Sequence, residues 1–402
     1  MSKAILTLNS GSSSLKFAVF GFDATQNTPG VSGKVTGIGG APEFSARGGD
    51  GEYLAKGILS NLNTTSSHED IIAHLLTWLP QHLEGRPLIA IGHRVVHGGS
   101  FFAAPTLVTN DVLDKLKTLI PLAPLHQPHN LAAIRAVTKW HPEVPQIACF
   151  DTAFHRTQDR LASLFALPRS LSDEGIMRYG FHGLSYEYIA SVLPQHLGSQ
   201  ADGRVIVAHL GNGASMCAMT NRQSVATSMG FTALDGLMMG SRCGTLDPGV
   251  VLYLMQSKGM TASQVEEMLY RQSGLLGVSG ISNNMQVLQN SSDPHAREAI
   301  ELYCFRAASI LAGLVSAIGG LDALVFTAGT GENSALVRKL TCDRLAWMGL
   351  HLDAEANDKN QITLSSSQST VAVLRLPTNE EAVVAEACRS FVTNNQIQDQ
   401  KF

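Results

Sequence analysis

The sequence has 402 residues and a formal net charge of −4, and charged residues make up only 15% of it. Because acidic and basic residues nearly balance, the chain has no basic field that would draw it to nucleic acid or to an anionic membrane, which argues against both classes of partner. The length exceeds what one hydrophobic core usually supports, so we expect two domains, and the low charge favours a subunit interface.

The 6 cysteines are widely scattered and form no CxxC pair. This spacing argues against a disulfide framework and a zinc knuckle, and it favours a cytoplasmic location where thiols stay reduced. The sequence opens with a strand-like pattern rather than a signal peptide. The longest apolar stretch, 307–326, is interrupted by serines, glycines and Asp322. It therefore predicts a helix, a glycine stop and a buried strand rather than a membrane span.

Strands and helices alternate along the chain in the hydrophobic pattern. The predicted elements are, in order, strands at 4–8 and 15–20, a helix at 69–79, a strand at 88–91, helices at 110–119 and 131–140, strands at 146–150, 205–210, 216–219 and 321–326, and a helix at 381–391. This alternation predicts an α/β fold with mostly parallel or mixed sheets.

A strand, an Asn/Gly/Ser turn and a second strand occur twice, around the loops Asn9–Ser14 and Gly211–Ser215. Each is the pattern of a hairpin. The repetition predicts two related domains, each opened by the same unit, with a cleft between them. We expect a first domain of residues 1–153 completed by residues 382–402, and a second domain of residues 154–381.

Glycine-rich and serine-rich loops are candidate phosphate sites. The loop that contains Ser12 and Ser14 can present backbone N–H groups and hydroxyls, with Lys16 on the strand that leaves it. The alternative is an ordinary hairpin turn with a solvated lysine. A second glycine turn, Gly329–Asn333, follows a buried strand and precedes a helix, so it can present N–H groups and a helix dipole to an anion. Several such loops indicate a polyphosphate ligand, although no Walker A motif is present.

Two arginines, one histidine and one aspartate lie in positions typical of active sites. Arg94 is expected just beyond a buried strand, and Arg242 lies in a glycine-flanked loop, where an arginine suits bidentate capture of carboxylate or phosphate. His182 lies in a third tight loop. Asp151 follows a buried strand, where α/β enzymes often place a catalytic carboxylate. The alternatives are structural arginines and an Asp151 that caps a helix.

Two histidine pairs raise the alternative of a zinc site: His93 with His97, and His126 with His129. The first pair precedes a double glycine. Prolines flank His126, and Pro128 is expected to break a helix there. Neither pair is therefore expected on a helix, and a dedicated zinc site is disfavoured.

Motifs along nearly the whole chain resemble the acetokinase family, which comprises acetate and propionate kinases. The matching segments, in the order typical of that family, are NSGSSSLKF (9–17), GHRVVHGG (92–99), LAPLHQPHN (122–130), FDTAFH (150–155), RYGFHG (178–183), HLGNGAS (209–215), SMGFTALDGLMMGSRCG (228–244), SGLLGVSGIS (273–282), GENS (331–334) and PTNEE (377–381). Each piece is weakly specific alone, but the ordered combination is highly specific.

The resemblance implies two related ribonuclease H-like domains of the superfamily of acetate and sugar kinases, heat-shock chaperone ATPases and actin, with a nucleotide cleft between them. The implied reaction is reversible, Mg²⁺-dependent phosphoryl transfer between ATP and acetate, giving acetyl phosphate and ADP; Mn²⁺ could replace Mg²⁺. A homodimer is also implied. The alternatives are a propionate or short-chain acid kinase, an acetate kinase that uses pyrophosphate, and a non-catalytic nucleotide sensor.

The resemblance also assigns roles to single residues. Asp151, His182 and Arg242 would be catalytic, and Asn9 and Glu380 would hold Mg²⁺. The acid or acyl phosphate would be bound by Arg94 and by a small apolar pocket of Val96, Leu125, Phe181 and Ala233. The nucleotide would be bound by Ser12, Ser14, Lys16, His209, Leu210, Gly211, Asn212, Gly213, Asn284, Met285, Gln286, Gly329, Thr330, Gly331, Glu332 and Asn333.

The chain departs from the family pattern at a few positions. Asn284 and Gln286 stand where Asp and Arg are usual, which weakens the expected contacts with ribose and adenine. Ala233 replaces a usual proline, which would loosen the acyl pocket. Leu184 and Tyr186 stand where Thr and His are usual.

Overall fold

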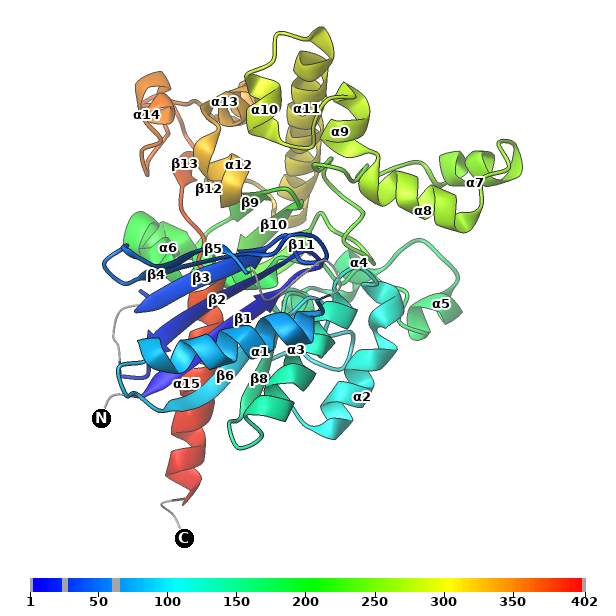
Figure 1. The fold of residues 1–402 in the computed structure, drawn as a ribbon. Helices are drawn as coiled ribbons and strands as arrows, with labels where there is room; N and C mark the ends of the chain where they lie inside the picture. The colour runs from blue at the N-terminus through cyan, green and yellow to red at the C-terminus, as the bar shows by residue number, and fades with distance from the viewer. Residues whose placement is uncertain (1–2, 24–27, 60–65, 400–402) are drawn as a thin grey trace. The chain divides into compact units, whose positions relative to one another are not determined.

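The computed structural model describes residues 3–23, 28–59 and 66–399, and the chain forms two compact units (Figure 1). The first unit comprises Met1–Ala153 with Asn379–Phe402, and the second comprises Phe154–Thr378. The C-terminal segment therefore returns to the first unit at Asn379, whereas the sequence placed this point at residue 382. The earlier return has a local cause, because the helix that belongs to the first unit begins at Glu380.

The first unit is built on an 8-stranded sheet in the order β5-β4-β3-β2-β1-β6-β8-β7. Its strands are β1 (Ala4–Ser10), β2 (Ser14–Gly21), β3 (Val31–Thr36), β4 (Glu43–Gly48), β5 (Tyr53–Ile58), β6 (Leu88–Val95), β7 (Thr106–Leu107) and β8 (Gln146–Phe150). β1, β6 and β8 run parallel and are almost fully buried, as parallel strands covered on both faces are. β2 to β5 extend the sheet as an antiparallel meander.

Helices cover this sheet on both faces. They are α1 (His68–Trp78), α2 (Asn110–Thr118), α3 (Gln127–Trp140) and α15 (Glu380–Asp399). In Figure 1, α1 and α3 lie in front of the sheet and α15 lies behind it, where it packs on β1 and β6. The approach of α15 is close at Gly92, since a Cβ built there would lie 2.3 Å from Val384 Cγ1 and 2.8 Å from Cys388 Sγ.

The second unit is built on a 5-stranded sheet in the order β11-β10-β9-β12-β13. Its strands are β9 (Val205–Leu210), β10 (Ala214–Thr220), β11 (Gln223–Thr227), β12 (Ala323–Thr327) and β13 (Ala372–Arg375). As in the first unit, an antiparallel hairpin, here β9–β10, pairs in parallel with a third strand, here β12. The predicted repetition of this supersecondary unit is confirmed.

Eleven helices of the second unit surround this sheet or extend from it. They are α4 (Arg160–Ser163), α5 (Arg169–Asp173), α6 (Gly183–Leu197), α7 (Pro248–Gln256), α8 (Ala262–Arg271), α9 (Gly274–Ser279), α10 (Met285–Gln289), α11 (Pro294–Ile318), α12 (Ala328–Asn333), α13 (Ala335–Asp343) and α14 (Ala354–Asp358). Short 3₁₀ turns occur at Leu79–His82, Ile120–Leu122, Ala153–Thr157, Gly198–Asp202 and Ala346–Met348.

The apolar stretch 307–326 folds as the sequence predicts. α11 ends at Ile318, Gly319 follows with a φ of +70°, and β12 begins at Ala323. Glycine suits this cap because the left-handed conformation is strained for other residues. By length and composition α11 passes a test for a membrane span, but 44% of its apolar window is buried inside the unit. A core helix of this kind passes the same test, so the match is weak evidence.

The structure corrects three local predictions. β6 continues to Val95, so Arg94 lies on the strand and not beyond it. α3 begins at Gln127, and Pro128 occupies its first turn, where the missing N–H of proline is not needed. The expected glycine turn Gly329–Asn333 is itself the helix α12, and Ser334 caps the following helix α13.

The close packing at Gly92 generates a stability prediction. We expect Gly92→Ala to lower the free energy of unfolding by about 1–3 kcal/mol, because the added methyl overlaps side chains of α15. Gly313→Ala is the matched control: Gly313 lies inside α11 with no atom within 4 Å of a built Cβ, so alanine should raise stability by about 0.5–1 kcal/mol. Urea unfolding of both variants checks the opposite signs, and equal signs would contradict the packing argument.

Candidate functional site

Arg94 on β6 is the centre of a polar cluster in the first unit. Its Nε donates to Asp151 Oδ1 at 3.0 Å and its Nη2 donates to Asp151 Oδ2 at 2.5 Å, so the pair is bidentate. Its Nη1 donates to Asn9 Oδ1 at 3.1 Å, and Glu380 Oε2 lies 3.5 Å from Nε. Residues from β1, β6, the end of β8 and the start of α15 thus meet at one guanidinium, as the parallel order of these strands requires.

The cluster contains one guanidinium and two carboxylates. The side chain of Asp151 is 2% exposed and that of Arg94 is 18% exposed. Burial by itself lowers the pKa of Arg94, but the carboxylates of Asp151 and Glu380 outweigh it and the net effect is a raised pKa. The guanidinium is therefore always charged. Two carboxylates facing one arginine leave a local excess of negative charge when both are ionised.

The oxygen atoms of this cluster suit a hard divalent cation. Asn9 supplies an amide oxygen, and Glu380 and Asp151 supply carboxylate oxygens, all around Arg94. In the part of the chain that the structure describes, no 3 side chains of His, Cys, Asp or Glu form a metal cluster. Mg²⁺ is usually held by one or two carboxylates with water and substrate phosphates rather than by an all-protein cage. The predicted metal residues fit that mode of binding.

The other predicted residues of the first unit differ in exposure. Lys16 is exposed. It pairs in register with Asn9 across the β1–β2 hairpin, so both residues lie at the loop end of this hairpin. Ser12 is exposed and Ser14 is half-buried. Val96 is 4% exposed and its N–H donates to Asn130 Oδ1, whereas Leu125 is half-buried.

His93 and His97, the first histidine pair of the zinc alternative, have protein partners. His93 shares a hydrogen bond with the side-chain amide of Gln146, and the N–H of Gly99 donates to Nδ1 of His97. Burial lowers the pKa of each of these imidazoles to about 4, so both are neutral at physiological pH.

His182 is the centre of the second cluster, in the second unit. It caps α6 with φ +59°, a left-handed conformation that costs energy for a residue other than glycine and must be held by its surroundings. Nδ1 of His182 shares a hydrogen bond of 2.8 Å with Ser215 Oγ, and Ser215 Oγ also contacts the hydroxyl of Tyr186. These hydrogen bonds orient the imidazole ring, and its Nε2 lies 3.4 Å from a Cβ built at Gly213.

His209 on β9 stacks on His182, with ring centroids 4.2 Å apart and 13° between the planes. Its Nδ1 shares a hydrogen bond of 2.8 Å with Ser185 Oγ, which donates to Thr378 Oγ1 at 2.9 Å. Both imidazoles are thus held by hydroxyls through Nδ1. The sequence analysis assigned no role to Ser185, Ser215 and Thr378. Ser215 and Thr378 belong to the motif segments 209–215 and 377–381, but a serine or threonine does not by itself indicate which side chain it will hold.

Arg242 lies beside His182. A Cβ built at Gly213 would lie 3.4 Å from His182 Nε2 and 3.6 Å from Arg242 Nη1, so both groups flank the same glycine. Arg242 Nη1 donates to the backbone oxygen of Ala233 at 3.0 Å. Burial lowers its pKa, and within the described ranges it forms no ion pair with a carboxylate. This guanidinium is therefore charged, partly desolvated and uncompensated, as a site for an anion requires.

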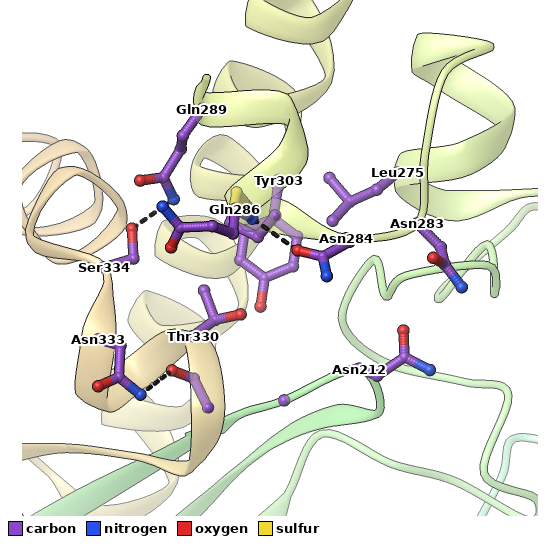
Figure 2. A pocket seen from close by; sticks show the side chains of 13 residues that line it. Asn212, Leu275, Asn283, Asn284, Gln286, Gln289, Tyr303, Thr330, Asn333 and Ser334 are labelled. Atoms are coloured by element: carbon purple, nitrogen blue, oxygen red, sulfur yellow. Dashed lines mark hydrogen bonds between the residues drawn. The ribbon is translucent and has the colours of Figure 1, made fainter. Parts of the chain in front are cut away.

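A pocket of about 570 Å³ opens in the same unit (Figure 2). Its lining residues come from the β9–β10 loop, α9 to α12, the segment before α10 and the junction after α12: Gly211, Asn212, Leu275, Asn283, Asn284, Met285, Gln286, Gln289, Tyr303, Gly329, Thr330, Asn333 and Ser334. Every polar side chain in this list is a neutral amide or hydroxyl. The pocket can therefore recognise a ligand by hydrogen bonds, but its lining supplies no formal charge.

The lining is ordered by local hydrogen bonds. Asn284 Oδ1 caps α10 by accepting from the N–H groups of Gln286 and Val287, and Asn333 Nδ2 donates to the backbone oxygen of Gly329 (Figure 2). Because the oxygen of Asn284 is engaged in this cap, its amide nitrogen is the group left for a ligand. An aspartate at this position would keep the cap and offer an oxygen instead.

Arg338 supports the pocket from behind. It is 0% exposed, and its guanidinium donates to the backbone oxygens of Gly331 and Glu332 on α12 at 2.9 and 3.0 Å. It also donates to Asn357 Oδ1 and to Asn360 Oδ1, both at 2.7 Å. Since its acceptors are neutral, burial lowers the pKa of Arg338 to about 10, and it stays charged at neutral pH.

The structure thus brings many of the predicted residues together within each unit. Asn9, Arg94, Asp151 and Glu380 form the first cluster, and His182, His209, Gly213 and Arg242 form the second. The pocket is lined by Gly211, Asn212, Asn284, Met285, Gln286, Gly329, Thr330 and Asn333, but not by Leu210, Gly331 or Glu332. Phe181 is 1% exposed and Ala233 is half-buried, and both belong to the second unit, whereas Val96 and Leu125 belong to the first.

Sequence reasoning missed several residues that shape the pocket, and the reason is tertiary. Tyr303 and Gln289 lie on α11 and α10, and Ser334 joins α12 to α13, so their grouping depends on how these helices pack. Leu275 and Ser334 do belong to the motif segments 273–282 and 331–334, but the sequence analysis assigned neither residue a role in a pocket.

Comparison with known proteins identifies the family. The model of the Acetokinase family matches residues 4–386. An acetate kinase of Rhodopseudomonas palustris is 51% identical over 395 residues, covering 96% of this chain and 97% of that protein, and one of Methylocella silvestris is 47% identical over 391 residues with the same coverage.

Solved structures agree with the sequence relatives. A propionate kinase from Francisella tularensis has a TM-score of 0.89 at 37% identity and covers 96% of this chain and 99% of its own. The acetate kinase of Porphyromonas gingivalis has a TM-score of 0.87 at 33% identity and covers 97% and 100%. These likenesses confirm the predicted fold class, that of the two-domain acetate and sugar kinases. The chain belongs to the acetokinase family.

Proposed function

We propose that the protein catalyses reversible transfer of a phosphoryl group between ATP and acetate, giving acetyl phosphate and ADP. The observation that carries the proposal is the pair of groups at Gly213, the imidazole of His182 and the uncompensated guanidinium of Arg242. Such a pair suits a transferring phosphoryl group, and the neutral pocket beside it suits the rest of a nucleotide. Membership of the acetokinase family supports both assignments.

The chemistry needs little acid–base catalysis. A carboxylate oxygen is already a nucleophile and attacks the γ-phosphorus, while the bond from that phosphorus to the β-bridging oxygen breaks and leaves ADP. The work of the protein is to position both reactants in line and to neutralise charge on the three equatorial oxygens. Arg242 and His182 Nε2 would donate to those oxygens. The hydroxyls of Ser215 and Tyr186 hold the imidazole, so it needs no reorganisation during transfer.

The cluster in the first unit would serve the acid and the metal. Asn9 and Glu380 would hold Mg²⁺ directly or through water, with Asp151 close by, and the bound ion would screen charge on the nucleotide phosphates. Arg94 would orient the carboxylate of the acid, but its bidentate pair with Asp151 already uses Nε and Nη2. Arg94 therefore has a second task, which is to fix the catalytic carboxylate.

The choice of acid and donor belongs to the proposal. Val96, Leu125, Phe181 and Ala233 would close the acyl pocket, and apolar sites distinguish one methylene by only about 1–3 kcal/mol. We therefore expect acetate to be preferred and propionate to be accepted. A non-catalytic nucleotide sensor is disfavoured, because a sensor has no need for the bidentate Arg94–Asp151 pair.

We further propose a homodimer, and α7 provides the surface for it. None of its 9 residues is buried, although most are apolar, and Val250, Leu252, Tyr253 and Met255 are each 39–54% exposed. Figure 1 shows α7 and α8 extending from the rest of the second unit. An apolar helix in this position is stabilised by contact with a second copy. We also propose a cytoplasmic location, supported by the six cysteines, all of which are free thiols.

The direct test is a hydroxamate assay of acyl phosphate formation with acetate, Mg²⁺ and a panel of ATP, GTP, CTP and pyrophosphate. We expect ATP to work, the other nucleotides to be accepted within about tenfold, roughly 1.4 kcal/mol, and EDTA to stop the reaction. Asn284→Asp with Gln286→Arg should sharpen the preference for ATP, because ionised groups bind ribose and base more strongly than amides. If the protein were active only with pyrophosphate, pyrophosphate would replace ATP as the proposed phosphoryl donor.

The different charge environments of the two arginines generate a second prediction. Arg242→Ala should lower kcat by about 10²-fold or more, since a transition-state contact is lost, with stability changed by about 1 kcal/mol at most. Arg94→Ala should also lower kcat, and it should destabilise the protein by about 3 kcal/mol or more because Asp151 is left buried without its partner. Kinetics and urea unfolding separate the two effects.

Arg297→Ala serves as the control for this pair, because its side chain is 83% exposed and pairs only with Glu301 on the helix surface. It should change neither kcat nor stability appreciably. Wild-type turnover in Arg242→Ala would remove Arg242 from the reaction.

The dimer is tested by molecular mass in solution. The wild-type protein should have twice the mass of one chain in sedimentation or light scattering at micromolar concentration. Leu252→Glu should shift the protein toward monomer, because it places a charge in the middle of the apolar face of α7. Gln256→Glu, at the end of the same helix, is the control. A wild-type protein that is a monomer, or a Leu252→Glu variant that remains a dimer, would contradict the role of α7.

A further inference from the structure

Tyr303 is a buried phenol with no partner of its own. It lies on α11, it is 3% exposed, and its hydroxyl is buried without a hydrogen-bond partner among the residues that the structure describes. Burial raises the pKa of Tyr303, so the group is a neutral O–H donor throughout the physiological range.

A buried hydroxyl without a hydrogen-bond partner lowers the stability of the folded protein. More than nine in ten buried polar groups in proteins find a partner, and an unpaired one loses its hydration without replacement. Phenylalanine would fill the same space without that loss. The hydroxyl is therefore expected to be satisfied in some state of the protein, and the surroundings of the ring indicate which state.

Tyr303 lines the neutral pocket of about 570 Å³. Figure 2 shows its ring directed into that pocket, with the hydroxyl toward the space that Asn284 and Thr330 border. The Gly211–Asn212 end of the pocket belongs to the loop that continues to Gly213, where the phosphoryl-binding pair lies. Tyr303 instead stands beside α10, which packs on α11.

We propose that the hydroxyl of Tyr303 makes a direct hydrogen bond to the nucleoside part of the bound nucleotide and sets the affinity of the pocket for it. The inference rests on the proposed function, in which this pocket holds ATP. Asn284 and Asn333 in the lining already use polar atoms in hydrogen bonds to the backbone, whereas the phenol has no such bond and is fixed by burial of its ring. A pre-positioned donor loses little entropy on binding.

The test compares Tyr303→Phe with the wild type in equilibrium binding of Mg-ATP, adenosine and inorganic tripolyphosphate. We expect the dissociation constants of Mg-ATP and adenosine to rise by about three- to tenfold, the range of one net hydrogen bond, and that of tripolyphosphate to stay unchanged. In the acyl phosphate assay the KM for ATP should rise by a similar factor, because the contact is lost from the ground state and the transition state alike.

A thermal melt without nucleotide provides an independent readout with the opposite sign. Tyr303→Phe should unfold at the same temperature as the wild type or higher, because an unpaired hydroxyl has been removed, while the stabilisation by saturating ATP becomes smaller. The control is Tyr188→Phe on α6, a half-buried tyrosine outside the pocket, which should leave all three dissociation constants unchanged.

Unchanged binding of ATP in Tyr303→Phe, weaker binding of tripolyphosphate, or a lower melting temperature without nucleotide would each overturn the inference. Failure of the proposed function gives a different result. In that case the wild type would form no acyl phosphate from ATP and acetate, whatever the nucleoside affinity of the two proteins.

Discussion

The bidentate pair of Arg94 and Asp151 is the interaction on which the polar cluster of the first unit depends. It joins β6 to the end of β8, and the same guanidinium reaches Asn9 on β1 and approaches Glu380 at the start of α15. Segments separated by hundreds of residues are therefore ordered by one charged group. Because Asp151 is almost fully buried, the cluster tolerates this carboxylate only while the arginine is present. The close packing of α15 at Gly92 holds Glu380 in reach.

The arginine of the second cluster, Arg242, has the opposite electrostatic environment. Arg242 has backbone and thioether contacts but no carboxylate partner in the described part of the chain, and His182 beside it is held in a left-handed conformation by neighbours. An uncompensated cation and a fixed imidazole are energetically unfavourable in an empty site and favourable when an anion arrives. This contrast between an arginine with a carboxylate partner and one without is the main electrostatic difference between the two clusters.

Much of the fold and the site could be predicted from sequence, for physical reasons that particular residues show. Buried strands such as β8 and β9 have continuous apolar runs, so their bounds were predicted exactly as they stand, and the ordered motifs fixed the family. The strands β3 to β5 were missed because glycines such as Gly33 in β3 and Gly57 in β5 interrupt their pattern. Arg94 was predicted to lie beyond its strand, because polar residues at the end of β6 do not give the apolar pattern of a buried strand, although tertiary contacts bury it. Ser215, Tyr303 and Arg338 could not be found, because their roles arise only when distant helices and strands pack.

The buried guanidinium of Arg338 extends the pocket beyond the residues that line it. One group holds the carbonyls of Gly331 and Glu332 on α12 and, on its other edge, the side chains of Asn357 and Asn360 at α14. The helix α12 and the segment at α14 are therefore linked by hydrogen bonds to the same guanidinium, so strain introduced at one is transmitted to the other. The residues that keep the wall of this pocket in place therefore extend to α14, although α14 contributes no residue to the pocket lining.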